Sequence, residues 1–288
     1  MIKIILILVL FFLILYCFNT IEKFTNNNYI LPKVIYCYWH DSESKLMNAF
    51  LNNWKNKLSK EWQIIFINDN NINNYVNNEF IKKYNNLEKF RFSDFLRLEL
   101  LKNNGGVWMD ISTIITNGNF LDKYHKEMID NNYDVCVYEF EDRTLIQSEP
   151  YLENWFIIAP QNSKYIIDLY NQFEKAREMD FLVYKKNILL PSGINLLKTL
   201  NYEDSTYLMQ HAIVHYLLKT GNQYKINKKN AKESFLKLHI SLVWDSDKII
   251  NNILTNNDWS NYYAIKLCGN QRKTIKNEEE FIKRINTI

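Results

Sequence analysis

Residues 92–116, FSDFLRLELLKNNGGVWMDISTIIT, combine a helix signal, a glycine stop and an apolar strand. Ser93 and Asp94 are typical of a helix start, and the leucines that follow them form an apolar face. Asn104–Gly106 ends the predicted helix, because Asn and Gly tolerate the backbone conformation that closes a helix. The strand expected at 107–111 then indicates an α/β fold, in which helices pack against a sheet.

Four polar side chains border this helix and strand. The strand brings Asp110 to its carboxyl end, and Ser112 follows just beyond it. Ligands of open α/β sheets bind outside the carboxyl ends of the strands. Asp94 and Arg97 are three residues apart, so they share one face of the predicted helix. We therefore expect all four side chains to border one pocket.

The flanking sequence alternates strands with helices. VIYCYW at 34–39 and WQIIFI at 62–67 are apolar runs of strand length, and Leu46, Phe50 and Trp54 recur between them at helical spacing. Parallel neighbours need such a crossover, so the pattern predicts a parallel sheet with helices on its faces. Further strands are predicted at 135–140 and 155–159, and further helices at 163–177 and 206–219.

Composition limits the class of protein. The chain has 288 residues, of which 47% are hydrophobic and 15% aromatic, so it can bury a sizeable core and is neither disordered nor a coiled coil. Its formal charge of +3 is too small for a surface that follows nucleic-acid phosphates, and no nucleic-acid partner is expected. The four cysteines exclude a disulfide framework. Buried thiols are predicted at Cys37 and Cys136, with one bridge as an open alternative.

The N-terminus predicts a membrane anchor. Residues 1–18 are apolar except for Lys3, and a helix of that span would be about 27 Å long, close to the thickness of a bilayer core. The run has neither the small residues of a signal-cleavage site nor the polar stripe of a buried core helix. We predict an anchor at 1–19, a linker at 20–30 and a folded domain at 31–288.

Charge bears on the side of the membrane. Lys3 and the free amine favour a cytoplasmic N-terminus, which leaves the domain on the non-cytoplasmic side, as in an ER or Golgi lumen. The chain contains no N-x-[ST] glycosylation site, and this argues against a eukaryotic lumen. The prediction is a single-pass membrane protein with its domain outside the cytoplasm.

Several motifs together resemble a known family. S-D-x-x-R at 93–97, a following glycine pair and W-x-D-x-S at 108–112 have the order found in sugar transferases with a DXD-type motif. PKVIYCYW at 32–39 is similar to the opening strand of the capsular polysaccharide synthesis branch. The resemblance implies a GT-A-like, Rossmann-type fold with a mixed, mostly parallel sheet. In that fold 31–160 binds the nucleotide sugar, and 161–288 is a more helical half on the acceptor side.

The resemblance also implies contacts with substrate. Asp94 and Arg97 match family positions that hold the donor sugar, and Trp39 matches an aromatic position near the nucleotide base. Asp110 and Ser112 match the motif beside the diphosphate. The implied donor is a UDP- or GDP-sugar, the implied acceptor is a hydroxyl of a glycan or glycolipid, and the implied transfer retains the anomeric configuration.

The implied cofactor is a divalent cation. Mg²⁺ or Mn²⁺ with oxygen ligands would offset the charge of the diphosphate as the sugar bond breaks. Ser112 stands where many related transferases have a second Asp, and a hydroxyl is the weaker ligand. We therefore predict a site formed by Asp110 and Ser112 and completed by His239, which follows a short apolar strand in the second half of the chain.

Several of these residues have alternative interpretations. Asp94 can be an N-cap with Arg97 as its ion-pair partner, and Trp39 can be a core aromatic. His211 and His215 are four residues apart on a predicted helix, as in zinc proteins, but the run lacks the H-E-x-x-H base. We expect one of these two histidines to face the acceptor instead.

The sequence thus predicts a membrane-anchored glycosyltransferase, of the hexosyltransferase type, in polysaccharide or glycan synthesis. The alternative is a non-catalytic membrane-tethered protein that binds nucleotide sugars or glycans and derives from such an enzyme. A metal-dependent hydrolase is the third candidate. Turnover distinguishes them, because a binding protein releases no nucleoside diphosphate and a hydrolase prefers water as its acceptor.

Overall fold

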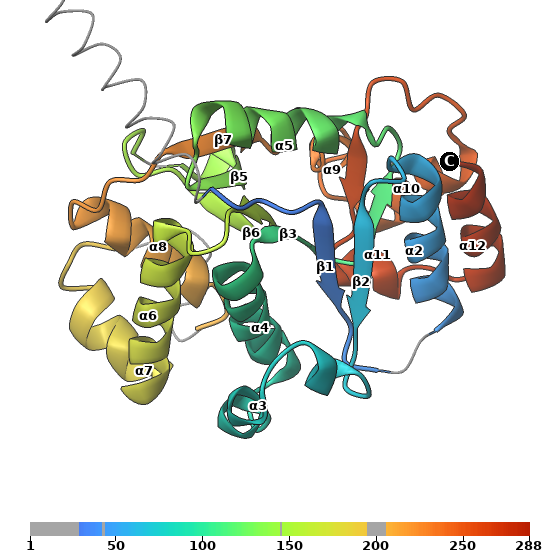
Figure 1. Cartoon of the computed structure of the whole chain (residues 1–288). Helices are drawn as coiled ribbons and strands as arrows, with labels where there is room; N and C mark the ends of the chain where they lie inside the picture. Colours follow the sequence, from blue (N-terminus) through green and yellow to red (C-terminus); the bar gives the residue numbers. More distant parts are fainter. Residues whose placement is uncertain (1–28, 42–43, 145, 195–205) are drawn as a thin grey trace, which may run out of the picture. The chain divides into compact units, whose positions relative to one another are not determined.

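The computed structural model describes residues 29–41, 44–144, 146–194 and 206–288. Its centre is a six-stranded sheet in the order β2-β1-β3-β6-β5-β7 (Figure 1). The sheet consists of β1 (Val34–Tyr38), β2 (Gln63–Ile67), β3 (Gly106–Met109), β5 (Val135–Glu139), β6 (Leu152–Ala159) and β7 (Ile226–Asn230). A second, two-stranded antiparallel sheet pairs β4 (Thr113–Ile115) with β8 (Ala264–Lys266).

Helices pack on both sides of these strands. Figure 1 shows α6, α7 and α8 to the left of α4, and α2 and α12 to the right of β1 and β2. The helix α4 packs against α6, α6 against α8, and α2 against α12. The helices are α2 (Lys45–Lys57), α3 (Asn78–Tyr84), α4 (Lys89–Asn104), α5 (Asn119–Asn131), α6 (Lys164–Glu178), α7 (Phe181–Tyr184), α8 (Met209–Lys219), α9 (Lys237–Ser241), α10 (Ser246–Thr255), α11 (Gly269–Lys273) and α12 (Glu278–Thr287), with short helical turns η2 (Ile72–Asn74), η3 (Glu141–Arg143) and η4 (Lys185–Leu189).

The central sheet is mixed. β1 pairs in parallel with β2 and with β3, as the alternation of strands and helices predicts. β6 lies antiparallel to both β3 and β5, and β5 pairs in parallel with β7. The sheet is therefore mostly parallel and flanked by helices.

Aromatic side chains fill the core. Phe120 and Tyr124 of α5 pack against Phe156 of the sheet, and Phe235 contacts the ring of Tyr138 with centroids 4.8 Å apart. These rings are buried. Such pairs add stabilisation beyond the area that they bury.

The predicted thiols are confirmed for two cysteines. Cys37 of β1 and Cys136 of β5 are buried and unbridged. Cys268 is also unbridged. Cys17 lies outside the described residues.

The start of α4 differs from the sequence prediction. The helix begins at Lys89, so Ser93 and Asp94 lie in its second turn rather than at its start. Both side chains point into a pocket instead of capping the helix. The interpretation of Asp94 as an N-cap is therefore wrong.

The end of α4 agrees with the prediction. The helix closes at Asn104, and Gly105 follows with a φ of 67°. Gly106 has a φ of 107°, and a Cβ at this position would lie 2.8 Å from the carbonyl oxygen of Val34. Glycine at 106 thus also allows β3 to approach β1 closely.

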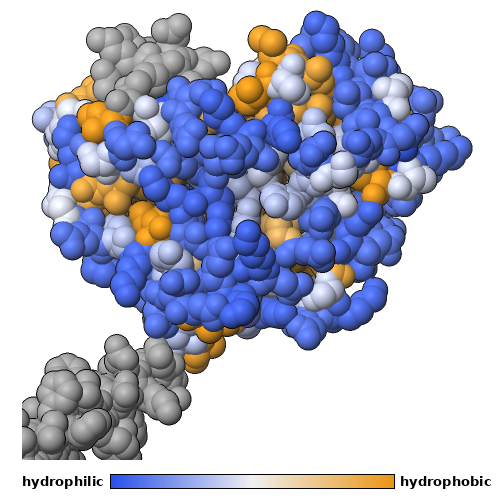
Figure 2. Space-filling model, turned by 90° about the horizontal axis from the view of Figure 1, so that it is seen from above, coloured by the Kyte–Doolittle hydropathy of each residue, from blue (hydrophilic) through white to orange (hydrophobic). Residues whose placement is uncertain are grey.

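The predicted membrane anchor at 1–19 lies outside the described residues, and so does most of the linker at 20–30. Within the part of the chain that the structure describes, no helix has the length and apolarity needed to cross a bilayer. Residues Leu31–Ile288 form one compact unit. On the face shown in Figure 2, the described residues are mostly hydrophilic, and the hydrophobic ones form small groups.

Candidate active site

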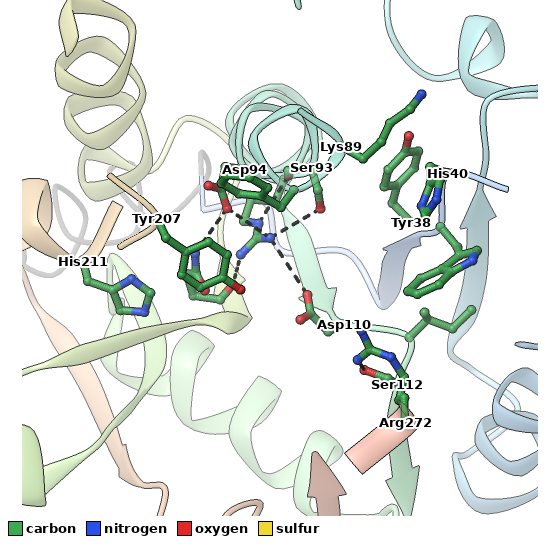
Figure 3. A pocket seen from close by; sticks show the side chains of 15 residues that line it. Tyr38, His40, Lys89, Ser93, Asp94, Asp110, Ser112, Tyr207, His211 and Arg272 are labelled. Carbon is green, nitrogen blue, oxygen red and sulfur yellow. Dashed lines mark hydrogen bonds and ion pairs between the residues drawn. The ribbon is translucent and has the colours of Figure 1, made fainter. Parts of the chain in front are cut away.

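A pocket of about 290 Å³ lies at the carboxyl ends of β1 and β3 (Figure 3). These strands are parallel neighbours, so the residues that follow them emerge at the same edge of the sheet. The helix α4 supplies another wall. The lining residues are Tyr38, Trp39, His40, Lys89, Phe90, Ser93, Asp94, Arg97, Asp110, Ile111, Ser112, Asn154, Tyr207, His211 and Arg272.

Backbone contacts fix the loop that follows β3. The Asp110 N–H donates to the Trp155 carbonyl at 2.9 Å, which continues the pairing of β3 with β6. The Thr113 hydroxyl donates to the Asp110 carbonyl at 2.8 Å. Trp54 of α2 then donates its indole N–H to the Thr113 carbonyl at 2.7 Å. The loop is held from the sheet and from a helix, and this positions the Asp110 carboxylate at the pocket.

Asp94 and Arg97 meet inside the pocket, as their spacing predicts. One Asp94 carboxylate oxygen lies 3.3 Å from Arg97 Nη2, and the other lies 3.3 Å from Arg91 Nη1. Arg97 also donates to the Asn154 carbonyl at 2.7 Å and lies 4.0 Å from Asp110. Asp94 is only 5% exposed and Arg97 only 6%. Asp94 and Arg97 of α4 thus form one charged network with Asp110, which follows β3 (Figure 3).

The two carboxylates differ in their protonation equilibria. Burial raises the pKa of Asp94, and the charges of Arg97 and Arg91 only partly offset this. Burial also acts on Asp110, but the charges of Lys266 and Arg97 outweigh it and hold the pKa of that carboxyl below its usual value. Asp110 is therefore firmly an anion at neutral pH.

Trp39 lies at the mouth of the pocket and not in the core. Its ring is half-buried, and the Arg272 guanidinium lies 5.3 Å from the ring centroid. The centroid of the neighbouring His40 ring is 5.3 Å from that of Trp39. Trp155, by contrast, is buried and stacks on Tyr138 with centroids 5.1 Å apart. Trp39 is thus the tryptophan that can stack on a ligand ring.

Two of the three predicted metal ligands lie together. However, the Asp110 carboxylate already accepts from the Trp108 indole N–H at 3.0 Å and lies 3.2 Å from the Lys266 ammonium. The same ammonium lies 3.0 Å from the Ser112 hydroxyl oxygen. A protein cation therefore occupies the space between the two side chains.

The third predicted ligand is elsewhere. His239 lies in the helix α9, not after a strand as the sequence analysis expected, and it is fully buried without lining the pocket. In the described ranges, no three His, Cys, Asp or Glu side chains are grouped so that they could hold a metal ion. The residues present do not fit a Mg²⁺ or Mn²⁺ site, and the divalent cation stays a prediction from the sequence.

The paired histidines have carboxylate partners. His211 Nε2 lies 3.4 Å from Glu153, and His215 bonds to Glu149. The side chain of His211 lines the pocket, opposite His40 in Figure 3, whereas that of His215 does not. Each imidazole pairs with its own carboxylate, so the geometry gives no support to a shared zinc ion.

Two cations at the site were not predicted from the sequence. Lys266 is the last residue of β8 and is 6% exposed, and Arg272 of α11 lines the pocket. A signal for Lys266 was available, because a lysine inside the apolar run Ala264–Leu267 indicates a buried cation with a partner. For Arg272 no local pattern exists, since only the tertiary fold brings α11 to the loop after β3.

Comparison with known proteins identifies a family. A family model described as "Capsular polysaccharide synthesis protein" matches residues 12–256. Among solved structures, "PaToxG Glycosyltransferase" is 13% identical, covers 73% of this chain and 95% of its own, and has a TM-score of 0.35. A glycosyltransferase involved in the glycosylation of the major capsid of PBCV-1 is 7% identical, covers 88% and 98%, and has a TM-score of 0.40. Neither structural similarity is close enough to support an inference about function. No curated protein matches the chain.

Proposed function

The chain belongs to the capsular polysaccharide synthesis protein family, and from that premise we propose that it is a glycosyltransferase. It moves a sugar from a nucleotide-diphosphate donor to a hydroxyl of a glycan or glycolipid. The observation that carries the proposal is the convergence of Asp94, Arg97 and Asp110 in one pocket at the carboxyl edge of the sheet, beside Trp39.

Each of these side chains has a role in the proposed reaction. The Trp39 ring stacks on the nucleotide base, because it lies half-exposed at the pocket mouth. Asp94 and Arg97 hold the sugar hydroxyls, since a carboxylate accepts and a guanidinium donates hydrogen bonds. Asp110 lies beside the sugar–diphosphate bond. His211 lies across the pocket and contacts the acceptor.

The proposed step is a substitution at the anomeric carbon. The bond from this carbon to the diphosphate oxygen breaks, and the nucleoside diphosphate leaves with the electron pair. The acceptor hydroxyl oxygen forms the new bond on the same face, which retains the configuration. Its proton passes to the departing phosphate oxygen. This route needs no enzyme nucleophile.

The proposal includes a membrane anchor at 1–19. The apolar run of the N-terminus supports it, and the charge of Lys3 favours a domain on the non-cytoplasmic side. This location suits an enzyme whose acceptor is a glycolipid, because anchoring keeps the pocket close to the membrane surface.

The test is donor turnover by the full chain. We expect release of nucleoside diphosphate from one member of a panel of UDP- and GDP-sugars in the presence of glycan acceptors. Asp110→Asn should lower this turnover at least a hundredfold, a loss of about 2.7 kcal/mol or more in transition-state stabilisation. Asp130→Asn is the matched control, because Asp130 forms an exposed ion pair with Lys126 on α5.

Two outcomes would contradict the proposal. Donor binding without release of nucleoside diphosphate, across all acceptors, would favour a binding protein. Release that is equally fast with water alone would favour a hydrolase.

A further inference from the structure

A buried lysine joins the two residues of the predicted metal motif. Lys266 Nζ lies 3.2 Å from the Asp110 carboxylate, 3.0 Å from the Ser112 hydroxyl oxygen and 3.0 Å from the Leu267 carbonyl oxygen. A lysine ammonium has three N–H donors. All three are directed at oxygens here, so the ammonium sits among these oxygens as a bound cation would.

An arginine extends this cluster into the pocket. Arg272 Nη1 lies 3.0 Å from the Ser112 hydroxyl oxygen and 3.0 Å from the Leu267 carbonyl oxygen. Its guanidinium also packs over the Trp39 ring. Figure 3 shows Arg272 beside Ser112 and below Asp110, at the wall of the pocket. It can reach a ligand whose base stacks on Trp39.

The Ser112 hydroxyl has no capacity left for a metal ion. A hydroxyl offers one donor and two acceptor positions. Ser112 Oγ donates to the Leu267 carbonyl at 2.9 Å and accepts from both Lys266 and Arg272. A metal ligand at Ser112 would have to displace one of these two cations.

The site carries an excess of positive charge. The contacts described above link four cations to only two carboxylates, and charge interactions are strong between buried side chains. A nucleotide sugar carries two negative charges on its diphosphate, so a cluster with more cations than carboxylates suits it. An aspartate at 112 would reduce this excess of cations, and this gives a physical reason for serine there. The cations are Arg91, Arg97, Lys266 and Arg272, and the carboxylates are Asp94 and Asp110.

We propose that Arg272 binds the donor diphosphate and that Lys266 holds the Asp110–Ser112 loop ready for it, so that binding requires no divalent cation. This inference rests on the proposed function. Arg272 contacts phosphate oxygens directly, because a guanidinium matches their geometry with paired N–H groups. Lys266 acts from beneath the pocket and is a positioning residue. Both residues lie beyond the range 12–256 that the family model matches.

The experiment measures nucleotide binding with and without metal. The full chain in mild detergent is freed of metal with EDTA, and its metal content is checked. UDP and GDP are then titrated by calorimetry in EDTA, in Mg²⁺ and in Mn²⁺. We expect the Kd of the preferred nucleotide to agree within about twofold, or about 0.4 kcal/mol, across the three conditions.

Substitutions test whether Arg272 is the cation that binds the nucleotide in the absence of metal. Arg272→Met should weaken nucleotide binding in EDTA at least tenfold, and Arg272→Lys should recover part of the loss because it keeps the charge. Lys273→Met is the matched control, since it removes the same charge from an exposed position on the same helix and should change the Kd less than twofold. Thermal melting of each variant verifies the fold.

The outcomes separate this inference from the proposed function. Binding that disappears in EDTA and returns with Mn²⁺ would overturn the inference, while turnover under Mn²⁺ would leave the transferase intact. An equal effect of Arg272→Met and Lys273→Met would also overturn it. Metal-free binding without turnover of any donor would uphold the inference and contradict the transferase. Absence of binding in every condition would contradict both.

Discussion

Asp94 is a carboxyl group whose burial carries a cost in stability. It is 5% exposed, and burial raises its pKa despite the neighbouring Arg97 and Arg91. A raised pKa in the folded state means that the ionised form costs stability at neutral pH. A buried carboxyl group with a raised pKa at a pocket is typical of a functional site.

Asp94→Asn should therefore separate stability from activity. We expect the free energy of unfolding at pH 7, measured in urea, to stay the same or to rise, because the neutral amide avoids the cost of a buried charge. Donor turnover should fall, since the amide no longer offers two acceptor oxygens. A marked loss of stability would show instead that the ion pairs with Arg97 and Arg91 outweigh the cost of burial.

His239 makes the stability of the fold depend on pH. Neither of its ring nitrogens has a hydrogen-bond partner among the described residues, and burial together with the charge of Lys266 lowers its pKa to about 4. The unfolded chain takes up this proton near pH 6.5, whereas the folded chain does not. The contribution of the neutral His239 to the free energy of unfolding is therefore fully present above about pH 6.5 and is lost as the pH falls toward 4.

The expected loss from His239 is about 2 kcal/mol between pH 7 and pH 5. His239→Phe should remove this part of the pH dependence in urea unfolding, because phenylalanine takes up no proton. His40→Phe is the control, since the His40 side chain is 37% exposed. Equal pH dependence in His239→Phe and the unmodified protein would contradict the assignment.

At the scale of elements, α2 supports the loop Asp110–Ser112 through its contacts with β4. Asn53 is 2% exposed and pairs with the backbone of β4. Its amide donates to the Ile115 carbonyl at 3.1 Å, and its oxygen accepts from the Ile115 N–H at 2.7 Å. The strand β4 follows directly after Ser112, so this helix–strand contact supports the loop.

Asn53→Ala should destabilise the protein by about 2–3 kcal/mol, because it leaves the Ile115 N–H and carbonyl buried without partners. Asn52→Ala removes the same side chain from an exposed neighbouring position and should change stability by less than about 0.5 kcal/mol. Thermal unfolding of both variants checks this. Equal melting temperatures of the two variants would contradict this, because they would mean that water or another group forms the hydrogen bonds of the Ile115 backbone.

The elements were predictable where the signal was local. Apolar runs located β1, β2, β5 and β6 within a few residues, and the glycines after α4 marked its end. The start of α4 was misplaced because Ser93 and Asp94 have the residue types of a helix cap but lie within the helix and line the pocket. His239 was expected just after a short apolar strand but lies in the helix α9, because a short apolar run does not distinguish a strand from a helix.

The site was predictable only in part, because only its residues with local sequence signals could be recognised. Asp94, Arg97, Asp110 and Ser112 lie close to one another in sequence, Trp39 directly follows an apolar strand, and all five line one pocket. Lys266 and Arg272 come from the other end of the chain, and their place depends on the pairing of β4 with β8. No local pattern encodes such a contact.

For the whole molecule, the anchor is the prediction that remains to be measured. The full chain should sediment with membranes and be released by detergent but not by high salt, because an apolar helix and not surface charge would hold it. The chain from Asn28 onward should remain in the supernatant. Release of the full chain by salt alone would contradict an anchor.

The pairing of β4 with β8 has a consequence for the order in which the protein becomes competent during synthesis. The Asp110–Ser112 loop is complete early, but the strand that stabilises it ends at Lys266, near the end of the chain. A nascent chain that has been elongated to residue 256 contains Asp94 and Arg97 but not yet Lys266 and Arg272. Such a chain, still attached to the ribosome, would be unable to bind the proposed donor. Capture of nucleotide sugar would begin only when β8 and α11 had been released and folded.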